Sequence, residues 1–424
     1  MVVLSLITCW GIVACDTTSP SSQVPKPAET KAMGGVVDEL RMGSLLPITG
    51  DLSAIGTPMS RAIDLLVDTV NKCGGVLGKP ISYFKQDDRT DPTAGAEAIT
   101  KLIQIDNVGA VVGAYASSVS TAGIAIASPN KVMMISPGST SPVFTQRAKE
   151  GKFDGYWART APPDTYQAAA LANLAYTKGL RKISTLVINN DYGVGFEKVF
   201  VAAFKQLGGE ILNEVNPTRY DPKAATFEAE ARAAFSNKPD GVVAVLYTET
   251  GGSVIKAAYE LGLTKDVSIL LTDGVQTEDF AKVVGKSPDG KLILAGAIGT
   301  VPGADGKSLA DLTKLYTATF NQPVGAFVPH SYDAAALIAI AAEAAKSGTG
   351  EAIKGKLREI ANAPGVEVTD VCEALKLVKA GTDIDFQGAS GNLNLDDYGD
   401  IKGSYDVWTF TPEGKIKVID RVSA

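Results

Sequence analysis

The feature that most constrains the fold is an alternation of strand-length apolar runs with helical patterns, which begins near residue 41 and restarts after residue 160. The first series indicates strands and helices in turn over residues 42–50, 58–75, 80–88, 92–106, 108–115, 118–128 and 131–136. The second series begins with a helix and covers residues 165–180, 182–190, 195–209, 210–216, 226–237, 240–247, 250–263 and 267–274. Such alternation is typical of βαβ units, in which right-handed crossovers build a parallel sheet. We therefore expect an α/β protein with two lobes of similar size and a cleft between them.

The C-terminal part of the chain extends this scheme. Residues 291–300 are typical of a strand that returns toward the first lobe, and residues 331–348 predict a long Ala-rich helix. The tail, residues 385–410, is rich in Gly, Asp and β-formers and predicts short strands and turns that complete the second lobe. The expected division is residues 39–161 with 291–385 in the first lobe and residues 162–290 with 386–424 in the second.

Composition restricts the class of protein. The chain has 424 residues, more than one hydrophobic core usually supports, so two domains agree with its length. Hydrophobic residues make up 45% and charged residues 21%, which is ordinary for a soluble globular protein. The net charge of -7 argues against a nucleic-acid partner, because phosphate binding needs clustered Lys and Arg.

The N-terminal residues predict an exported, anchored protein. Residues 1–14, MVVLSLITCWGIVA, are too short an apolar run to span a membrane and fit the core of a signal peptide. The stretch IVAC ends at Cys15 and resembles a bacterial lipobox, in which the cysteine is lipidated, although Ile12 stands where Leu is commonest and no Lys or Arg precedes the run. Residues 15–38 are expected to be a flexible tether, and a buried N-terminal strand is the alternative. We therefore expect a periplasmic, extracytoplasmic body held at the membrane by lipid.

Cysteine use fits that location. Cys9 lies in the predicted signal peptide and Cys15 would carry lipid, which leaves Cys73 and Cys372 as a possible disulfide in an oxidising compartment. Two free buried thiols are the alternative that the sequence leaves open.

The sequence gives no positive sign of catalysis or of a cofactor. His330 is the only histidine in the sequence, so the chain lacks the residues for a His-rich metal site and offers one candidate for a His-based triad. A structural role for His330 is expected. No GxSxG, Walker or GxGxxG motif occurs in its required strand-turn-helix context. We expect a binding protein without a metal or cofactor; an extracytoplasmic amidohydrolase is the enzymatic alternative.

Polar residues stand at the carboxyl ends of predicted strands, where open α/β sheets bind ligands. Ser117 precedes a helix whose first amides could receive an anion, and the loop 136–142 offers the carbonyl of Gly138 and the amide and hydroxyl of Thr140. In the second lobe Tyr192 and Asp273 follow strands. A carboxylate that faces a Ser/Thr cradle suits a zwitterion. Each residue also has an ordinary structural reading as a helix cap, turn former or rim aromatic.

A family resemblance rests on stretches that run from about residue 41 to residue 410. They are LLPITGDLSAIGTPM, NKCGGVLGKPI, DDRTDPTAGAEAITKLI, MISPGSTSP, YWARTAPPDTYQ, NNDYGVGF, LTDGV and GASGNLNLDDYGD. On these residues the chain resembles the bacterial periplasmic amino-acid-binding proteins of the leucine/isoleucine/valine-binding family, the receptors of ABC importers. The resemblance implies the type I periplasmic-binding-protein fold, in which two Rossmann-like lobes with parallel sheets are joined by a three-strand hinge and close around one ligand.

The resemblance also implies roles for individual residues. Ser117, Ser139 and Thr140 would hold the ligand carboxylate, while Gly138, Thr140 and Asp273 would hold its ammonium. Here Gly138 stands where Ala is frequent, and Asp273 stands where members often carry Glu or Asp, of which Asp reaches less far. Tyr192 and Asp164 would take part in closing the cleft. The residues expected to line the side-chain pocket are Ile55, Tyr115, Ala116 and Phe327.

That pocket is largely apolar, with one phenol and no charged residue, so a neutral amino acid, aliphatic or small and polar, is expected. The implied partners are the transmembrane subunits of an ABC permease, and a monomer is expected. Two alternatives stay open: a receptor of the same fold for an amide, urea or an aromatic acid, and a ligand-binding sensory protein.

Overall fold

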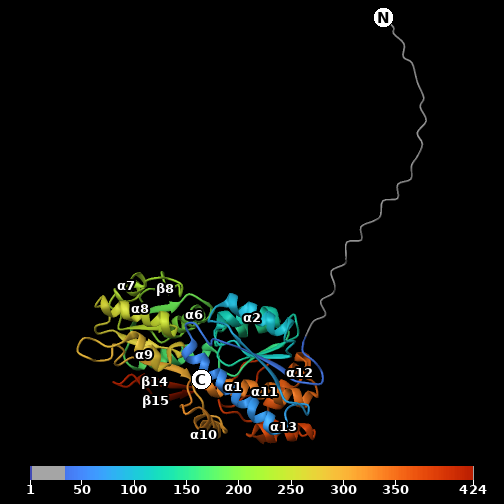
Figure 1. Ribbon diagram of the computed structural model, residues 1–424. Coiled ribbons are helices and arrows are strands. Elements are labelled where there is room, and N and C mark those ends of the chain that lie inside the picture. Colours follow the sequence, from blue (N-terminus) through green and yellow to red (C-terminus); the bar gives the residue numbers. More distant parts are fainter. Residues whose placement is uncertain (2–33, 424) are drawn as a thin grey trace. The chain divides into compact units, whose positions relative to one another are not determined.

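The computed structural model describes Met1 and residues 34–423. The predicted signal peptide, the lipidation of Cys15 and the tether as far as residue 33 lie outside the described residues. The fold below is that of the folded body, and element labels follow Figure 1.

The first lobe is built on a five-stranded parallel sheet. Its order is β2 (Ser82–Asp87), β1 (Arg41–Leu46), β3 (Ala110–Gly113), β4 (Met133–Ser136) and β5 (Trp157–Arg159). The helices that connect these strands are α1 (Ser53–Lys72), α2 (Pro92–Gln104), α3 (Ser117–Ala127) and α4 (Val143–Lys149). Figure 1 shows α2 on one side of this sheet and α1 on the other, where α1 packs against α11 (Val328–Ala345). The predicted parallel sheet of the first lobe is therefore present.

The second lobe has a larger, mixed sheet. Its order is β15 (Ile416–Ser423), β14 (Ser404–Phe410), β11 (Ile298–Pro302), β10 (Ser268–Leu271), β9 (Gly241–Val245), β6 (Lys182–Ile188) and β7 (Glu210–Ile211), and β8 (Thr218–Tyr220) also pairs with β6. In this sheet β14 pairs antiparallel with both β11 and β15, and the other pairings are parallel. Its helices are α5 (Asp164–Thr177), α6 (Asp191–Gln206), α7 (Glu228–Phe235), α8 (Thr248–Glu260), the short 3-10 helix η1 (Asp273–Val275) and α9 (Glu278–Val284).

The sequence explains why α11 lies at the centre of the first lobe. Its residues are small and apolar on nearly every side, and almost all of them are buried. A helix without a polar face must be covered on several sides. Here α1, α12 (Gly350–Ala361) and α13 (Val371–Lys379) pack against it, and a small parallel pair of strands, β12 (Val366–Val368) and β13 (Ile384–Phe386), adjoins α12 and α13.

Three segments of the chain cross between the lobes. They are residues 160–163 after β5, residues 303–308 after β11 and residues 387–403 after β13. Two of them hydrogen-bond to each other, because Gly306 N–H donates to the carbonyl of Ala389 at 3.2 Å. The third is joined to β14, since the hydroxyl of Tyr405 donates to the carbonyl of Pro163 at 3.1 Å. These three crossings correspond to the hinge that the resemblance implies.

The structure corrects three of the expected boundaries. Residues 298–302 form β11 between β10 and β14, so this strand belongs to the second lobe and does not return to the first. In the tail, Asp400 binds Arg159 of β5, so this part of the tail packs on the first lobe. Residues 34–38, placed in the tether, contact the first lobe, because Gly350 N–H donates to the carbonyl of Gly34 at 2.8 Å.

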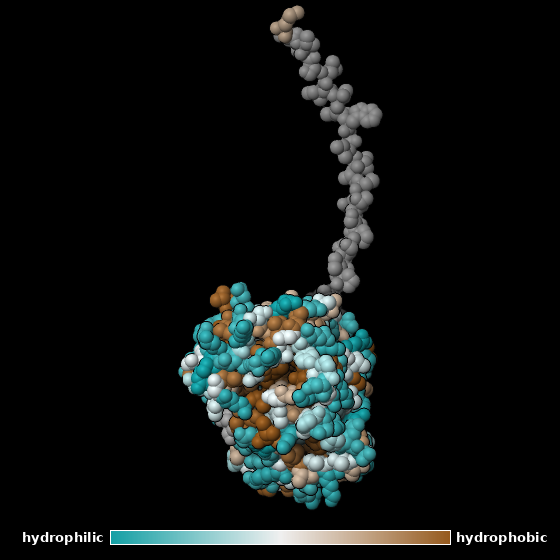
Figure 2. Space-filling model, turned by 90° about the vertical axis from the view of Figure 1, so that its left-hand side faces the viewer, coloured by the Kyte–Doolittle hydropathy of each residue, from teal (hydrophilic) through white to brown (hydrophobic). Residues whose placement is uncertain are grey.

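Two further features complete the body. Cys73, which ends α1, and Cys372 of α13 form a disulfide within the first lobe, with their Cα atoms 6.0 Å apart. No helix within residues 34–423 is both long and apolar enough to cross a bilayer. Figure 2 shows a mostly hydrophilic face, with apolar side chains gathered in its hollowed middle.

Candidate functional site

The loop after β4 is held in one shape by its own hydroxyl groups. Ser136 Oγ donates to the carbonyl of Ala114 at 2.6 Å and accepts from the amide of Ser139 at 2.8 Å. Ser139 Oγ lies within 3.1 Å of the carbonyls of Ala114 and Tyr115 and 2.8 Å from Ser120 Oγ. Because its amide and its hydroxyl both serve these internal bonds, Ser139 does not reach the cleft. These bonds tie the ends of β3 and β4 together, and the assignment of Ser139 to a ligand carboxylate stays a prediction that they do not support.

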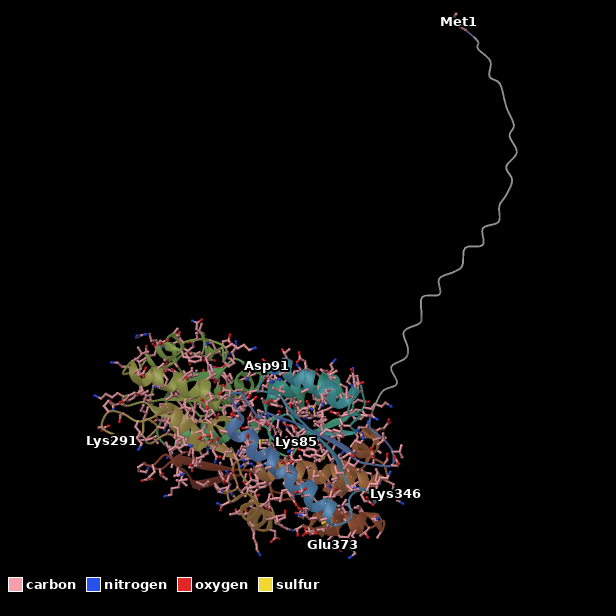
Figure 3. All side chains as sticks on the ribbon, in the orientation of Figure 1. Met1, Lys85, Asp91, Lys291, Lys346 and Glu373 are labelled. Carbon is pink, nitrogen blue, oxygen red and sulfur yellow. A yellow bond between two sulfur atoms is a disulfide. The ribbon has the colours of Figure 1, made fainter. Side chains whose placement is uncertain are left out.

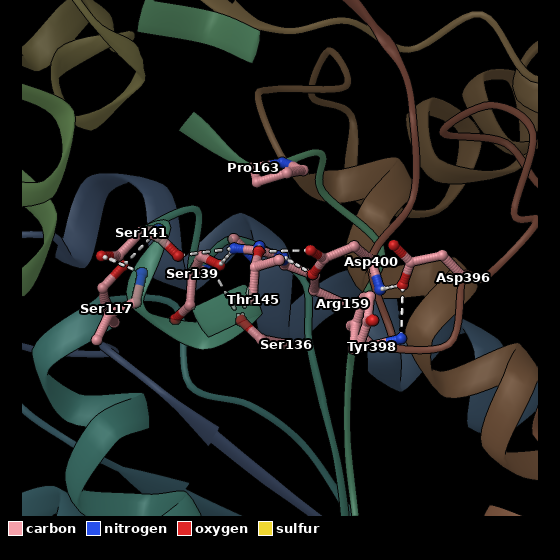
Figure 4. A network of polar contacts seen from close by, with 12 residues as sticks. Ser117, Ser136, Ser139, Ser141, Thr145, Arg159, Pro163, Asp396, Tyr398 and Asp400 are labelled. Atoms are coloured by element: carbon pink, nitrogen blue, oxygen red, sulfur yellow. Dashed lines mark hydrogen bonds and ion pairs between the residues drawn. The ribbon is translucent and has the colours of Figure 1, made fainter. Parts of the chain in front are cut away.

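Arg159 holds the same loop in place, and Figure 4 shows its guanidinium between the loop and Asp400. Its side chain is fully buried, and its Nη1 donates to the carbonyls of Ser139 at 3.0 Å and Ser141 at 3.1 Å. Its Nε donates to Asp400 Oδ1 at 2.7 Å, and its Nη2 donates to Thr145 Oγ1 at 2.8 Å. A guanidinium has five donors in a rigid fork, so one side chain can hold backbone carbonyls and a carboxylate together. Nothing in the sequence pattern singled out Arg159.

The loop leaves other polar groups free. Thr140 Oγ1 and the hydroxyl of Tyr115 are buried and have no hydrogen-bond partner. The same is true of both carboxylate oxygens of Asp164 and of Gln167 Oε1, which lie on the first turn of α5. Buried polar atoms without partners are rare in proteins, so their occurrence together indicates a site that a ligand or water completes.

The second lobe contributes a carboxylate that is already oriented. Asp273 Oδ1 accepts from Gln167 Nε2 at 2.8 Å and from the hydroxyl of Tyr192 at 3.0 Å. The ring of Tyr192 stacks on the ring of Tyr247, with a centroid distance of 5.9 Å and an interplanar angle of 10°. Tyr192 follows β6 and Asp273 follows β10, so both stand where the sequence placed them, at carboxyl ends of parallel strands.

Two buried carboxyl groups influence each other at this place. Burial raises the pKa of Asp273 to about 6, although its bonds from Gln167 and Tyr192 lower it. Burial also raises the pKa of Asp164 well above its ordinary value, and the neighbouring charge of Asp273 raises it further. A cationic group between them would favour the ionised forms, because opposite charges lower carboxyl pKa values. The pair is therefore suited to an ammonium group.

Residues of both lobes line a small cavity of about 10 Å³. Its lining residues are Tyr115, Ala116, Ser117, Gly138, Tyr192, Tyr247, Asp273 and Gly274. Six of the predicted residues line this cavity, whereas Thr140 and Asp164 are buried near it without lining it. Tyr247 was missed, yet it ends the predicted strand 240–247, so the rule that selected Tyr192 and Asp273 could have found it. Gln167 was also missed; it stands one helical turn after Asp164 on α5.

Tyr115 limits the space in the predicted side-chain pocket. A Cβ atom at Gly138 would lie 2.2 Å from Cδ2 of the Tyr115 ring, so the ring occupies the place of a side chain at 138. Phe327 does not line the cavity but supports this ring edge-on at a centroid distance of 5.0 Å. Ile55 is buried in α1 and is not among the lining residues.

His330 takes no part in the cavity. Its side chain is buried, and burial lowers its pKa to about 3, so the imidazole is neutral. Within the part of the chain that the structure describes, no group of three or more His, Cys, Asp or Glu side chains could hold a metal ion.

Known proteins resemble this chain over most of its length. The family pattern described as "Receptor family ligand binding region" matches residues 58–413. The chemotactic signal transduction system substrate-binding protein BasB of Halobacterium salinarum is 28% identical over 380 residues, which cover 84% of this chain and 83% of that protein. The Leu/Ile/Val-binding protein BraC3 of Rhizobium johnstonii is 27% identical over 315 residues, which cover 74% of this chain and 81% of that protein.

A solved structure agrees with the fold. The leucine binding protein LivK of Thermotoga maritima superposes with a TM-score of 0.75 at 25% sequence identity. The superposition covers 91% of this chain and 99% of that protein. The similarity therefore includes both lobes and the hinge between them.

Proposed function

The chain belongs to the family described as receptor family ligand binding region, and from this premise we propose that it is the substrate-binding protein of an ABC importer, which binds a neutral amino acid between its lobes. The observation that carries the proposal is the group of buried, unpartnered polar atoms at the cleft. Acceptors on Asp164 and Gln167 lie close to the carboxylate of Asp273, and Thr140 lies beside Asp164, whose N–H donates to the carbonyl of Thr140 at 2.8 Å. A family of ligand-binding regions, with the fold described above, agrees with a binding protein rather than an enzyme.

The amino group of the ligand would lie on the acidic side of the site. An ammonium has three N–H donors and no acceptor, and this side offers the free oxygens of Asp164, the carboxylate of Asp273 and the carbonyl of Gly138. Hydrogen bonds between charged groups are about twice as strong as neutral ones. We therefore extend the role of Asp164, which the resemblance linked to closure, to direct binding of the ammonium.

The carboxylate of the ligand would lie at the start of α3. The N-cap residue of this helix, Ala116, has no side chain that could cap it, so the first N–H groups are available to an anion. Ser117 Oγ accepts from the amide of Ser141 at 3.3 Å and keeps its own hydrogen for a ligand. Thr140 adds an unpartnered hydroxyl. Together these groups form the anion cradle that Ser139 was expected to share.

The side chain of the ligand would contact Tyr115 and Ala116. Because the Tyr115 ring narrows this space, small neutral side chains should be preferred to large ones, and its buried hydroxyl favours a ligand with a polar side-chain atom. A charged side chain would be desolvated without a partner, which costs several kcal/mol. Delivery to a permease, a periplasmic location with a lipid anchor at Cys15, and a monomeric state complete the proposal.

A sensory role is the second candidate function. The relative from Halobacterium salinarum is named as a substrate-binding protein of a chemotactic signal transduction system, so this fold can present a ligand to a signalling partner. The two roles share one binding site and differ in the membrane partner. A receptor for an amide, urea or an aromatic acid is the alternative that would change the ligand itself.

The test is a thermal-shift screen against the twenty amino acids, urea, short amides and aromatic acids. A ligand that binds only the folded state raises the melting temperature. We expect a rise with small neutral amino acids in the unmodified protein and in the control Asp279→Asn, whose exposed carboxylate pairs with Lys282. The rise should be lost in Asp273→Asn. A rise only with amides or aromatic acids, or an undiminished rise in Asp273→Asn, would contradict the amino-acid proposal.

A further inference from the structure

Polar contacts outside the cavity join the two lobes directly. Ser141 Oγ, in the loop after β4, donates to the carbonyl of Asp191 in α6 at 2.8 Å. The carboxylate of Asp91, which Figure 3 labels where α2 begins, pairs with Lys223 Nζ of the second lobe at 3.1 Å. A third contact comes from Asp51, in the turn between β1 and α1.

Asp51 binds the first turn of α8 in the second lobe. Its Oδ1 accepts from the backbone N–H groups of Glu249 and Thr250, the latter at 3.1 Å, and its Oδ2 accepts from the hydroxyl of Thr250. Burial at this lobe boundary raises the pKa of Asp51, whereas the three bonds lower it. The carboxylate therefore fills the position of a helix N-cap, although it belongs to the other lobe.

Helix α8 has no cap of its own. Its N-cap residue, Tyr247, makes no side-chain bond to the first turn. By contrast α2, α6 and α13 are capped by their own N-cap residues, Asp91, Asn190 and Asp370. The first N–H groups of a helix need acceptors, and a carboxylate there is further favoured by the helix dipole. The cap of α8 is therefore supplied in trans, and it exists only when the lobes are together.

The loop that carries Asp51 is rigid. The carboxylate of Asp87 accepts from the amides of Ile48 at 3.0 Å and Thr49 at 3.2 Å. Gly50 has a φ of 85°, and a Cβ atom there would lie 2.2 Å from the carbonyl oxygen of Arg89, so only glycine fits this turn. Asp51 is thus positioned by bonds within the first lobe, whatever the second lobe does.

We propose that Asp51 sets the closing equilibrium of the two lobes by capping α8 from across the cleft. A contact that is made in the closed arrangement and lost in the open one shifts the population toward closure by its differential free energy. Both carboxylate oxygens of Asp51 bind the first turn of α8, so Asp51 would act as a positioning residue and not as a ligand contact. The inference goes beyond the proposed function and holds for whichever ligand the cleft accepts.

The test measures closure without any ligand. A Cβ atom at Gly195 would lie 3.8 Å from Cβ of Ser141 in the other lobe, which is the usual separation in a disulfide. We would prepare the full chain with Ser141→Cys and Gly195→Cys, and with Cys9→Ser and Cys15→Ser to remove competing thiols. The variant is equilibrated with reduced and oxidised glutathione, and mass spectrometry gives the equilibrium constant for the interlobe disulfide. This constant is proportional to the population in which the lobes meet.

We expect Asp51→Ala to lower this equilibrium constant about five- to tenfold, the usual effect of losing an N-cap. The matched control is Asp370→Ala, which removes an N-cap whose acceptor and helix lie in the same lobe, where Asp370 Oδ1 accepts from Glu373 N–H at 2.8 Å. The control should leave the constant unchanged. Thr250→Ala should add little to Asp51→Ala, because both remove one cap.

An unchanged constant in Asp51→Ala, or an equal decrease in Asp370→Ala, would overturn the inference. So would a failure of the interlobe disulfide to form, since the lobes would then not meet as described. A failure of every amino acid to bind would instead count against the proposed function and leave this test intact.

Discussion

At the scale of single residues, the contact between Gly138 and Tyr115 gives the sharpest prediction about ligand size. A Cβ atom at 138 would lie 2.2 Å from the Tyr115 ring, a distance at which one of the two must shift. We expect Gly138→Ala to lower the free energy of unfolding by about 1 to 3 kcal/mol, as overpacking does. Urea unfolding measures this change.

Two further variants test the cause of that effect. Gly355→Ala is the control, because a Cβ atom at 355 meets nothing within 4 Å. Tyr115→Leu in the Gly138→Ala background should restore most of the lost stability and shift binding toward larger amino acids, since the ring would no longer fill the pocket. Equal destabilisation by both alanine variants would disprove the contact between Gly138 and Tyr115.

The carboxyl of Asp273 gives a prediction with opposite signs for stability and binding. Burial raises the pKa of Asp273 from 3.8 to about 6, so the ionised form is unfavourable in the folded protein without a cation. A raised folded-state pKa means that stability falls as pH rises from about 4 through 6. Asp273→Asn should therefore raise the free energy of unfolding at pH 7 by about 1 to 3 kcal/mol. Urea unfolding at pH 7 and pH 5 checks this, because the gain should shrink at pH 5.

The same group predicts how binding depends on pH. An ammonium ligand binds the ionised carboxylate, so the affinity of the unmodified protein should decrease as pH falls below about 6. Titration calorimetry with the amino acid found by the screen measures this dependence. An affinity that stays constant from pH 7 to pH 5 would remove the Asp273 carboxylate from the ammonium site.

At the scale of elements, the buried pair of Arg159 and Asp400 joins β5 to the tail segment that precedes β14. Its Nε and Oδ1 atoms are 2.7 Å apart, and the Arg159 side chain is fully buried. Removal of one partner leaves a buried charge uncompensated, which typically costs about 3 to 5 kcal/mol. We expect Asp400→Ala to lower the free energy of unfolding by this amount. The exposed pair of Lys356 and Glu359 is the control, and Lys356→Ala should cost less than about 1 kcal/mol. Similar losses of unfolding free energy in the two variants would contradict a stabilising role for the buried pair of Arg159 and Asp400.

Elements with strong periodic patterns could be predicted from the sequence, whereas those that depend on distant contacts could not. Residues 182–190 were expected as a strand, and β6 spans Lys182–Ile188. The apolar run 291–300 predicted a strand of the first lobe, but β11 begins only at Ile298. Gly299 of β11 lies under Trp408 of β14, where a Cβ atom would be 2.5 Å from the indole. A partner more than a hundred residues away therefore decides where this strand belongs.

The candidate site also contains some residues that a local sequence pattern identifies and others that only distant contacts reveal. Tyr192 and Asp273 could be found because polar residues at strand ends have a local signature. Ser139 shares the composition of its neighbours, and only the bonds of its hydroxyl to residues 114–120 show that it faces inward. Arg159 acts through Asp400, which is far away in the sequence, so no local pattern could identify it, whereas the position of Gln167 one helical turn after Asp164 was a local signal that was overlooked.

At the scale of the whole molecule, the cavity is too small for a ligand to enter without movement of the lobes. Its volume is about 10 Å³, near the minimum for one water molecule and far below the roughly 300 Å³ at which ligand pockets usually begin. The three crossings are loops, and the lobes meet through few polar contacts, so rotation at the hinge is the available motion. Ligand exchange should therefore require the lobes to separate.

The interlobe disulfide between Ser141→Cys and Gly195→Cys gives the last prediction, because it would block that separation. When the disulfide is formed before the amino acid is added, binding should be lost, and an amino acid added beforehand should lower the yield of the disulfide, because a cavity of about 10 Å³ cannot hold it. Reduction of the disulfide should restore binding. The single variant Ser141→Cys, treated with the same oxidant and reductant, is the control and should exchange ligand throughout. Unimpeded exchange in the oxidised double variant would show that the ligand reaches its site by a route other than the cleft.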